Sequence, residues 1–374
     1  MGVEADCIVL VPGIFGFGTF GSERGAKIEY FAEVKRVLTA GTGIPGSRIR
    51  SAEPPPTGAI AHRVGELVGE IEAVLADPGT PPGARVHLVG HSTGGVDARL
   101  MANEGYTAFT AHGVDVARRE RVAARLGTIV TVSAPFYGSP CTVKLKLEFR
   151  GLVAALSAWS VLDRGGVLTG AFGPLLATML ATLEAVARDQ QSNEAVIALL
   201  SRLGLDRATV GQMVDFRNDI LADDRLVDDL APRSMAALNA SLGEDHPDIK
   251  SYVTVAPRPS LGDLGSLERR ALYLLLYAAT SDPGFSPVAF PAGPWLVGAP
   301  NPDLLGEAPR ACDGVVPSSS QTIAGEAVGI VLADHEDVIG HFDGEKNTTV
   351  FESGAGFTRS RFVRLWTDIA GRLT

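Results

Sequence analysis

The sequence predicts an α/β protein with a mostly parallel sheet and helices on both faces. Three short runs are expected to be strands: 7–11 is continuously apolar, which is typical of a strand buried in a parallel sheet, and 86–89 and 127–133 are the next two. The segments between and beside them show helical spacing, and in chain order they are 28–39, 62–75 and 96–103. This alternation of strand and helix indicates a parallel sheet that is covered on both sides.

Further along the chain, the pattern changes and then returns. Between 142 and 248 no convincing strand occurs and helical segments dominate, whereas strands are expected again at 252–255, 295–297 and 328–332, and a short one earlier at 48–52. We therefore expect a core formed by 1–141 and 249–374, interrupted by a helical cap or lid insertion at 142–248. Within that insertion, Leu176 and Met179 belong to one apolar helical stripe that starts after Pro174.

Composition excludes several classes of partner. The chain has 374 residues, with 33 Lys and Arg against 43 Asp and Glu, so its formal net charge is −10. Such a balance, without any basic run, gives no electrostatic footprint for nucleic acid or an anionic membrane and favours a neutral substrate. Three cysteines are an odd number, which favours buried thiols and leaves a single disulfide open. The composition leaves the oligomeric state open.

The amino-terminus and one uncharged stretch indicate where in the cell the protein is expected to be. Glu4 and Asp6 stand where a signal peptide carries positive charge, so we expect a cytoplasmic protein or the mature form of a secreted one. Residues 165–183 carry no charge, but they contain several glycines and a proline, and we expect an interior or interface helix there rather than a transmembrane segment.

The strongest candidate for a chemical site is G-x-S-x-G at 90–94, with Ser92 at its centre. An apolar strand ends just before it and a helix begins just after it. That is the setting of a nucleophile elbow, in which a sharp strand-to-helix turn exposes the serine hydroxyl above the sheet. An ordinary tight turn in a glycine-rich chain is the alternative interpretation.

A serine hydroxyl needs a base and an acid that orients the base. In this architecture the base follows the last strand, which favours His335 over His341. The acid should precede the base, and Asp313 is favoured because Gly314 allows a sharp turn after it. Asp282, Asp303 and Asp334 are the alternatives.

The tetrahedral intermediate of such chemistry needs two backbone N–H donors. One is expected from Thr93, the residue after the nucleophile. The other should come from the glycine-rich loop after the first strand, where Ile14 is favoured and Phe15 is the alternative.

Several segments, in this order along the chain, resemble the bacterial true-lipase family of α/β-hydrolases. They are LVPGIFGF, IEYF, LVGHSTGGVDARLMA, TIVTVSAPFYGSP, SYVTVA, CDGVVPSSS and ADHEDVIGHF. The resemblance implies an α/β-hydrolase fold, a lipase or esterase acting on carboxylic esters, Ser92, Asp313 and His335 as the catalytic triad, and a lid formed by the helical insertion. Phe15, Phe136, Leu176 and Met179 are the residues expected to contact the substrate.

The chain departs from that family at a metal site. Related lipases often hold a structural calcium ion with an aspartate two residues after the catalytic histidine, which Asp337 matches, and a second acid before the catalytic aspartate. Pro291, Ala292 and Gly293 occupy that second region, so we expect no metal and no cofactor. Asp337 is then expected to cap a helix.

The function predicted from the sequence is therefore cleavage of medium- or long-chain neutral acyl esters through an acyl-enzyme. An acyltransferase, a thioesterase or a polyester depolymerase could use the same residues, and a non-catalytic protein could share the fold. A dinucleotide-dependent oxidoreductase is disfavoured. The G-x-G-x-x-G pattern at 16–21 begins too far after its strand, and no acidic residue ends a clear second strand about twenty residues later.

Overall fold

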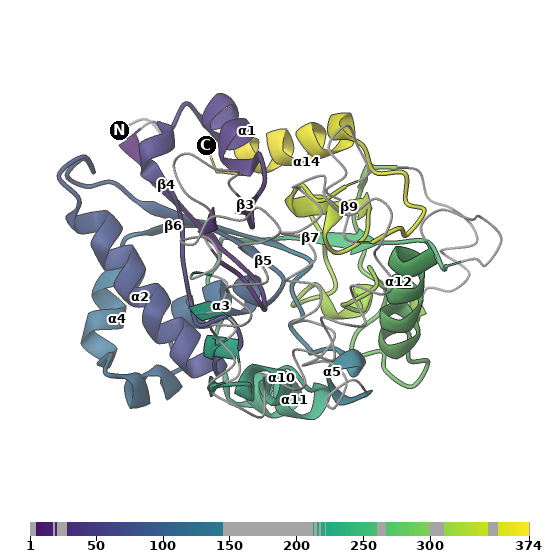
Figure 1. Cartoon of the computed structure of the whole chain (residues 1–374). Coiled ribbons are helices and arrows are strands. Elements are labelled where there is room, and N and C mark those ends of the chain that lie inside the picture. Colours follow the sequence, from purple (N-terminus) through teal and green to yellow (C-terminus); the bar gives the residue numbers. More distant parts are fainter. Residues whose placement is uncertain are drawn as a thin grey trace, which may run out of the picture.

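The computed structural model describes ten stretches of the chain, and every structural statement below concerns them. They are residues 5–17, 19–20, 28–144, 212, 215–216, 218–220, 222–259, 267–298, 310–342 and 351–373. A seven-stranded sheet forms the centre, in the order β4-β1-β5-β6-β7-β9-β8, and each neighbouring pair of strands is parallel (Figure 1). A small antiparallel ribbon of β2 and β3 is separate from it.

The strands have the following bounds: β1 (Cys7–Val11), β2 (Thr19–Phe20), β3 (Ile28–Glu29), β4 (Ile49–Ser51), β5 (Val86–His91), β6 (Leu126–Val132), β7 (Ile249–Val255), β8 (Trp295–Val297) and β9 (Gly329–Leu332). The α-helices are α1 (Val34–Thr42), α2 (Ile60–Ala76), α3 (Thr93–Ala102), α4 (Val116–Ala123), α5 (Pro140–Lys144), α10 (Arg225–Asp229), α11 (Pro232–Ser241), α12 (Leu267–Thr280) and α14 (Arg359–Arg372). Short 3-10 helices are η2 (Gly46–Arg48), η3 (Ala108–His112), η6 (Ser318–Ser320) and η7 (Asp337–Ile339).

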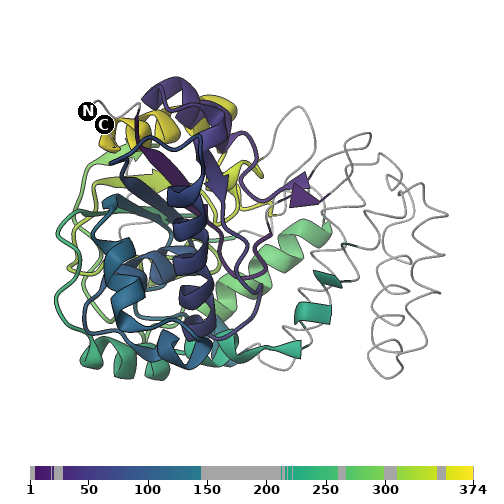
Figure 2. The same ribbon diagram turned by 90° about the vertical axis from the view of Figure 1, so that its left-hand side faces the viewer.

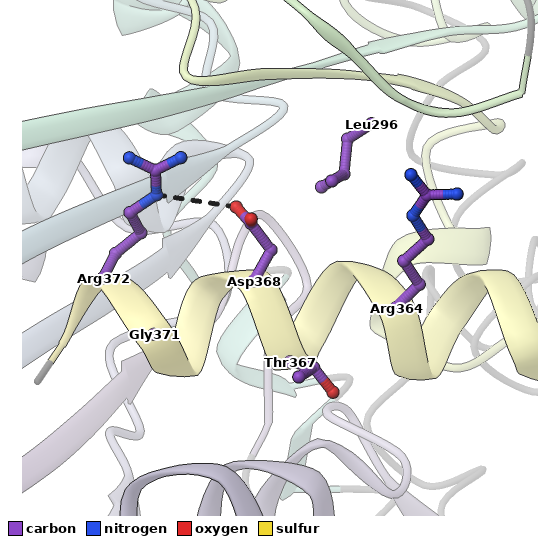
Figure 3. Close-up of a pocket in the computed structure, with 6 residues that line it drawn as sticks. All are labelled: Leu296, Arg364, Thr367, Asp368, Gly371 and Arg372. Carbon is purple, nitrogen blue, oxygen red and sulfur yellow. Dashed lines mark ion pairs between the residues drawn. The ribbon is translucent and has the colours of Figure 1, made fainter.

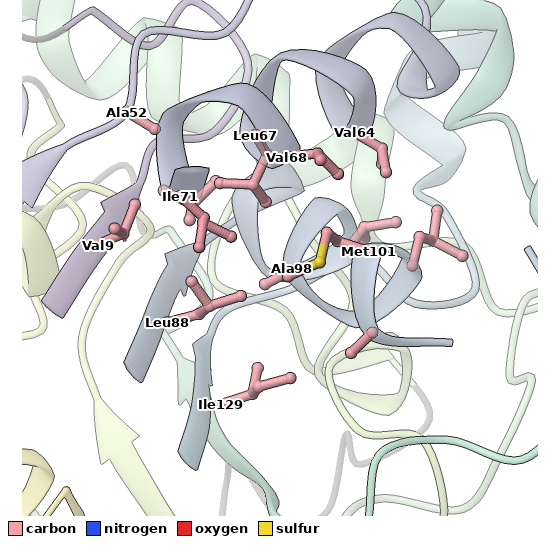
Figure 4. Close-up of a cluster of buried hydrophobic side chains, with 14 of the residues drawn as sticks. Val9, Ala52, Val64, Leu67, Val68, Ile71, Leu88, Ala98, Met101 and Ile129 are labelled. Carbon is pink, nitrogen blue, oxygen red and sulfur yellow. The ribbon is translucent and has the colours of Figure 1, made fainter. Parts of the chain in front are cut away.

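Both faces of the sheet are buried, as the alternation of strands and helices predicts. Alternate residues of β1 point to opposite sides: Val9 joins the cluster under α2 and α3, whereas Ile8 and Leu10 join the cluster with α1 and α14. The first cluster is drawn in Figure 4, and its labelled members from strands and helices are Val9, Leu88, Ile129, Val64, Leu67, Val68, Ile71, Ala98 and Met101. Helices α1 and α14 lie together on the other face (Figure 2).

The predicted α/β fold with a parallel sheet is therefore confirmed. The strand expected at 7–11 has those bounds, and the helices expected at 62–75 and 96–103 correspond to α2 and α3. The helix expected at 28–39 is wrong at its start, because Ile28 and Glu29 pair with β2. Helix α1 begins only at Val34, after Glu33, whose φ of 61° interrupts the helical path.

Part of the expected insertion packs directly on the core. Leu226 and Leu230 of the α10 region and Met235 of α11 belong to the same buried cluster as α2 and α3. The apolar helical stripe expected after Pro174, with Leu176 and Met179, lies outside the described residues. The boundaries of a separate cap therefore stay a prediction.

The structure also bears on the predictions about cysteines and about membrane-spanning helices. Cys7, Cys141 and Cys312 are all buried and none of the three forms a disulfide, so the predicted buried thiols are confirmed. In the described ranges, no helix has the length and apolar character needed to cross a bilayer.

Candidate active site

The site follows from the strand order at the centre of the sheet. The chain leaves β1 for β4 on one side and later returns to β5 on the other side of β1. At such a switch point the loops after the two strands run in opposite directions and leave a crevice at the carboxyl ends. The glycine-rich loop that begins with Pro12 and the turn at Ser92 are these two loops, so the fold brings them together.

Ser92 occupies a strained turn between β5 and α3. Its φ of 53° and ψ of −130° lie in a region that non-glycine residues rarely adopt. Its N–H donates to the carbonyl oxygen of Val132 at 2.9 Å, which ties the turn to β6. This is the conformation expected of a nucleophile elbow, in which the hydroxyl is presented above the sheet.

The glycines of G-x-S-x-G are required by close backbone contacts. A Cβ on Gly90 would lie 2.4 Å from the carbonyl oxygen of Gly94, and one on Gly94 would lie 2.0 Å from the carbonyl oxygen of Val11. Real Cβ atoms do not approach backbone so closely, so a larger residue at either position would push α3 away from β1 and β5. The spacing in the sequence thus reflects a strand and a helix that cross in contact.

The two expected backbone donors flank the serine. Within the described part of the chain, the N–H groups of Ile14 and Thr93 have no hydrogen-bond partner, whereas the N–H of Phe15 donates to the carbonyl oxygen of Pro56 at 2.8 Å. A Cβ on Gly13 would lie 3.1 Å from Ser92 Oγ, which places the loop directly beside the hydroxyl. The geometry therefore favours Ile14 over the alternative donor Phe15.

Asp313 and His335 form a buried pair. His335 Nδ1 lies 2.8 Å from Asp313 Oδ2, and the two residues are 3% and 0% exposed. The backbone N–H of His335 also donates to the carbonyl oxygen of Asp313 at 3.0 Å, and Gly314 makes the turn after the aspartate with a φ of 99°. Because a carboxylate only accepts, Nδ1 carries the proton and Nε2 is left as the basic nitrogen.

The Asp313 carboxylate is surrounded by donors. Its Oδ1 accepts the N–H groups of Val315 at 2.9 Å and Val316 at 2.7 Å, and its Oδ2 accepts the hydroxyl of Thr254 at 2.7 Å and the amide of Gln321 at 3.2 Å. Hydrogen bonds to the charged form offset the loss of solvation on burial. This shell holds the carboxylate facing the imidazole ring.

These surroundings raise the pKa of His335 above its usual value of 6.5. Burial alone lowers this pKa, but the negative charge of Asp313 and the hydrogen bond to it outweigh that effect, with smaller contributions from Glu336 and Asp334. A histidine of raised pKa is a stronger base once it is neutral.

His91 brings the serine turn and the histidine loop side by side. Its ring centroid is 4.7 Å from that of His335, and its Nε2 lies 3.0 Å from the His335 carbonyl oxygen. No hydrogen bond joins Ser92 Oγ to the His335 ring in this structure, and both residues are among those described. Such bonds are often long without a substrate and tighten only when it binds.

Arg63 of α2 binds the glycine-rich loop through hydrogen bonds. Its guanidinium donates to the carbonyl oxygen of Pro12 at 2.8 Å and forms an ion pair with Asp97 of α3 at 2.8 Å, and both charged side chains are fully buried. Burial raises the pKa of Asp97 to about 6, and the adjacent Arg63 charge opposes that rise. One side chain therefore links the loop after β1 to the helix that follows Ser92.

The remaining residues predicted for the site lie in different surroundings. Phe136 is fully buried in the core cluster under α2 and α3, where the Arg99 guanidinium lies 5.4 Å from its ring centroid, so we do not include it in the proposed site. Phe15 is partly exposed next to Ile14, whereas Leu176 and Met179 lie outside the described residues. His341, the alternative base, is buried, with Nε2 3.1 Å from the carbonyl oxygen of Tyr30.

Asp337 has a structural contact rather than the expected helix cap. Its Oδ2 accepts the N–H of Asp334 at 2.9 Å, while Asp334 Oδ1 accepts the N–H of Asp337 at 3.0 Å, so the two residues brace the loop of His335. The 3-10 helix η7 begins at Asp337 itself, with Glu336 at its N-cap. In the described part of the chain, no three His, Cys, Asp or Glu side chains cluster as metal ligands.

A surface pocket lies elsewhere, on the last helix. Figure 3 shows it along α14 and beside β8, and it is lined by Leu296, Arg364, Thr367, Asp368, Gly371 and Arg372. None of the residues around Ser92 lines it. It is thus distinct from the crevice at the carboxyl ends of β1 and β5.

The fold and the site geometry define an α/β-hydrolase fold, and comparison with known proteins agrees. No protein-family model and no curated protein matches the chain. Among solved structures, the lipase of Staphylococcus hyicus is 17% identical, with 98% of this chain and 95% of that chain covered and a TM-score of 0.52. Lipase 1 from Pelosinus fermentans is also 17% identical, covers 98% of each chain and has a TM-score of 0.53. These likenesses show that the chain shares the fold of bacterial lipases.

We predict that Arg63→Ala destabilises the protein by about 3–5 kcal/mol. The substitution would leave the buried Asp97 carboxylate without its partner and remove a donor from the glycine-rich loop. Chemical denaturation of the variant and the wild type measures the change.

The matched control is Arg36→Ala, because the ion pair of Arg36 with Glu33 is exposed and pairs of that kind contribute about 0–1 kcal/mol. Equal stability losses for the two variants would show that the Arg63–Asp97 pair does not support the site.

Proposed function

We propose that the protein is a serine hydrolase that cleaves carboxylic esters through an acyl-enzyme on Ser92. One observation carries the proposal: a buried Asp313–His335 pair lies beside a strained serine turn whose two neighbouring backbone N–H groups have no partner in the described structure. The chain order of serine, aspartate and histidine is that of α/β-hydrolases. The names of the structural neighbours, two bacterial lipases, support the same reaction class.

In the proposed first half-reaction, Ser92 Oγ attacks the ester carbonyl carbon while His335 Nε2 takes the hydroxyl proton. The carbonyl oxygen becomes an oxyanion that accepts hydrogen bonds from the N–H groups of Ile14 and Thr93, and the amino-terminus of α3 adds a favourable partial charge. Asp313 stabilises the imidazolium. The C–O bond to the alcohol then breaks, and His335 gives its proton to the leaving alcohol.

The second half-reaction repeats these steps with water. His335 Nε2 takes a proton from a water molecule as that water attacks the acyl carbonyl carbon of the acyl-enzyme. Collapse of the second tetrahedral intermediate breaks the bond to Ser92 Oγ, which recovers its proton from His335. The acid is released and the free enzyme is restored.

The proposed substrate is a neutral ester with a medium or long acyl chain. A net charge of −10 gives no long-range attraction for an anion. Ile14 and Phe15, which are partly exposed, directly follow Gly13, which lies beside Ser92. The apolar stripe with Leu176 and Met179 is expected to add to an acyl pocket. Each buried methylene is worth about 0.8 kcal/mol, so chain length should strongly affect the rate.

We predict that Ser92→Ala lowers kcat for p-nitrophenyl esters by about 10⁴-fold or more, because it removes the nucleophile. A fluorophosphonate should label the wild type and not this variant, as measured by intact-protein mass spectrometry. Ser47→Ala, at an exposed serine of η2, is the control and should be labelled like the wild type. Full labelling of the Ser92→Ala protein would remove Ser92 from the nucleophile role.

The raised pKa of His335 predicts the pH dependence of kcat/KM. The imidazolium cannot take the serine proton, so activity should fall as the pH drops through this pKa, with a midpoint above 6.5. Asp313→Asn removes the negative charge that raises the pKa, so the midpoint should move to lower pH while the plateau falls by about 10⁴-fold. An unchanged midpoint in the Asn variant would show that Asp313 does not face the working base.

Chain-length preference tests the substrate class. Four additional acyl carbons should raise kcat/KM by about a hundredfold, because they contribute roughly 3 kcal/mol of burial. A series of p-nitrophenyl esters from acetate to palmitate measures this preference. Activity that declines steadily from acetate upward would indicate an esterase for small substrates, and a uniformly low profile would indicate another acyl acceptor or a polymer.

A further inference from the structure

A chain of hydrogen bonds connects the glycine-rich loop to the loop of His335. The N–H of Gly13 lies 2.9 Å from the Tyr30 hydroxyl oxygen, which is 2.8 Å from His91 Nδ1. On the other side of the ring, His91 Nε2 lies 3.0 Å from the carbonyl oxygen of His335. The side chains of Tyr30 and His91 are buried, at 7% and 1% exposure, so water does not compete for these bonds.

The direction of every bond in this chain is fixed by its two ends and by a neutral His91 ring. The Gly13 N–H can only donate, so the Tyr30 oxygen accepts it. The His335 carbonyl can only accept, so His91 carries its proton on Nε2. Neutral His91 then has an acceptor at Nδ1, to which the Tyr30 hydroxyl donates. One tautomer satisfies all three bonds.

The electrostatics agree with a neutral ring. Burial lowers the pKa of His91 well below its usual value, and the nearby His335 lowers it further. Around the ring, Tyr30 and the His335 carbonyl occupy the two nitrogens, and His341 adds a smaller effect in the same direction. His91 is therefore suited to hold the two loops in position rather than to exchange protons during turnover.

The two end bonds of the chain reach backbone atoms of Gly13 and His335, and these atoms lie in or next to a proposed reacting group. Gly13 precedes Ile14, the proposed oxyanion donor. His91 precedes Ser92, and the carbonyl at the far end belongs to His335 itself. Resting on the proposed function, we propose that Tyr30 and His91 are positioning residues, whose hydrogen-bond relay sets the oxyanion donor and the His335 base relative to Ser92.

Packing alone is the competing explanation, and a subtle substitution separates the two. The ring of Tyr30 contacts Phe31 with centroids 4.9 Å apart and Phe17 at 6.1 Å. A phenylalanine at position 30 keeps these contacts and removes only the hydroxyl. The matched control is Tyr252→Phe, since the hydroxyl of that buried tyrosine bonds to Asp368 of α14, away from the relay.

We predict that Tyr30→Phe lowers kcat for the best p-nitrophenyl ester about 10- to 100-fold, because small displacements of reacting groups are costly in rate. KM should stay within about twofold, since no substrate contact is removed. The rate of fluorophosphonate labelling of Ser92 should fall in parallel. Tyr252→Phe should leave kcat and labelling within about twofold of the wild type.

Substitutions at His91 complete the test. His91→Leu breaks the relay and should lower kcat as Tyr30→Phe does, whereas His91→Gln can donate again to the His335 carbonyl and should recover part of the loss. The double variant Tyr30→Phe with His91→Leu should be no slower than the worse single variant, because both interrupt one chain. Measurements well below each variant's melting temperature keep unfolding out of the comparison.

The outcomes separate this inference from the function on which it rests. Tyr30→Phe with the activity of Tyr252→Phe would overturn the relay and leave the hydrolase standing. Fully additive losses, or no recovery in His91→Gln, would also overturn it, since packing alone would produce them. A wild type that neither cleaves esters nor reacts with a fluorophosphonate would overturn the proposed function and the relay together.

Discussion

The site depends on the direct contact between the turn at Ser92 and the end of β1. Gly94 packs against the carbonyl oxygen of Val11 so closely that no side chain fits between them. This contact fixes the start of α3 over the centre of the sheet, next to the loop that carries Gly13 and Ile14. The Arg63–Asp97 pair then joins the loop after β1 to α3, and the bonds of Tyr30 and His91 join that loop to the loop of His335.

The sequence predicts the fold well because short strands, the first of them continuously apolar, alternate with helical segments, which is typical of a parallel sheet covered on both faces. The prediction fails where the secondary structure that a segment's own residues favour differs from the one that its tertiary contacts impose. Residues 28–33 have helical composition, yet Ile28 and Glu29 pair with β2. Helix α12 was not predicted, since a short apolar run such as ALYLLLYAA fits a buried strand or a buried helix equally well.

The residues of the proposed site also fall into those that the sequence predicts and those that it does not. Ser92, Thr93, Asp313 and His335 could be selected because each stands just after an expected strand or turn, and the structure brings Asp313 and His335 into contact. Tyr30 and His91 were missed as partners because their bonds join residues far apart in the sequence, and no local pattern encodes such pairs. Arg63 could have been noticed in the sequence. It interrupts the apolar stripe of α2 four residues before Leu67, and a charge at such a position needs a buried partner.

The backbone conformation of Ser92 has a consequence for how this protein can change over generations. A serine with a φ of 53° costs about 1–3 kcal/mol, and glycine would relieve much of that cost. A single substitution to glycine would therefore remove the hydroxyl and make the fold more stable. Thermodynamic stability and retention of the proposed nucleophile oppose each other at this one position, so selection for stability alone would discard the hydroxyl.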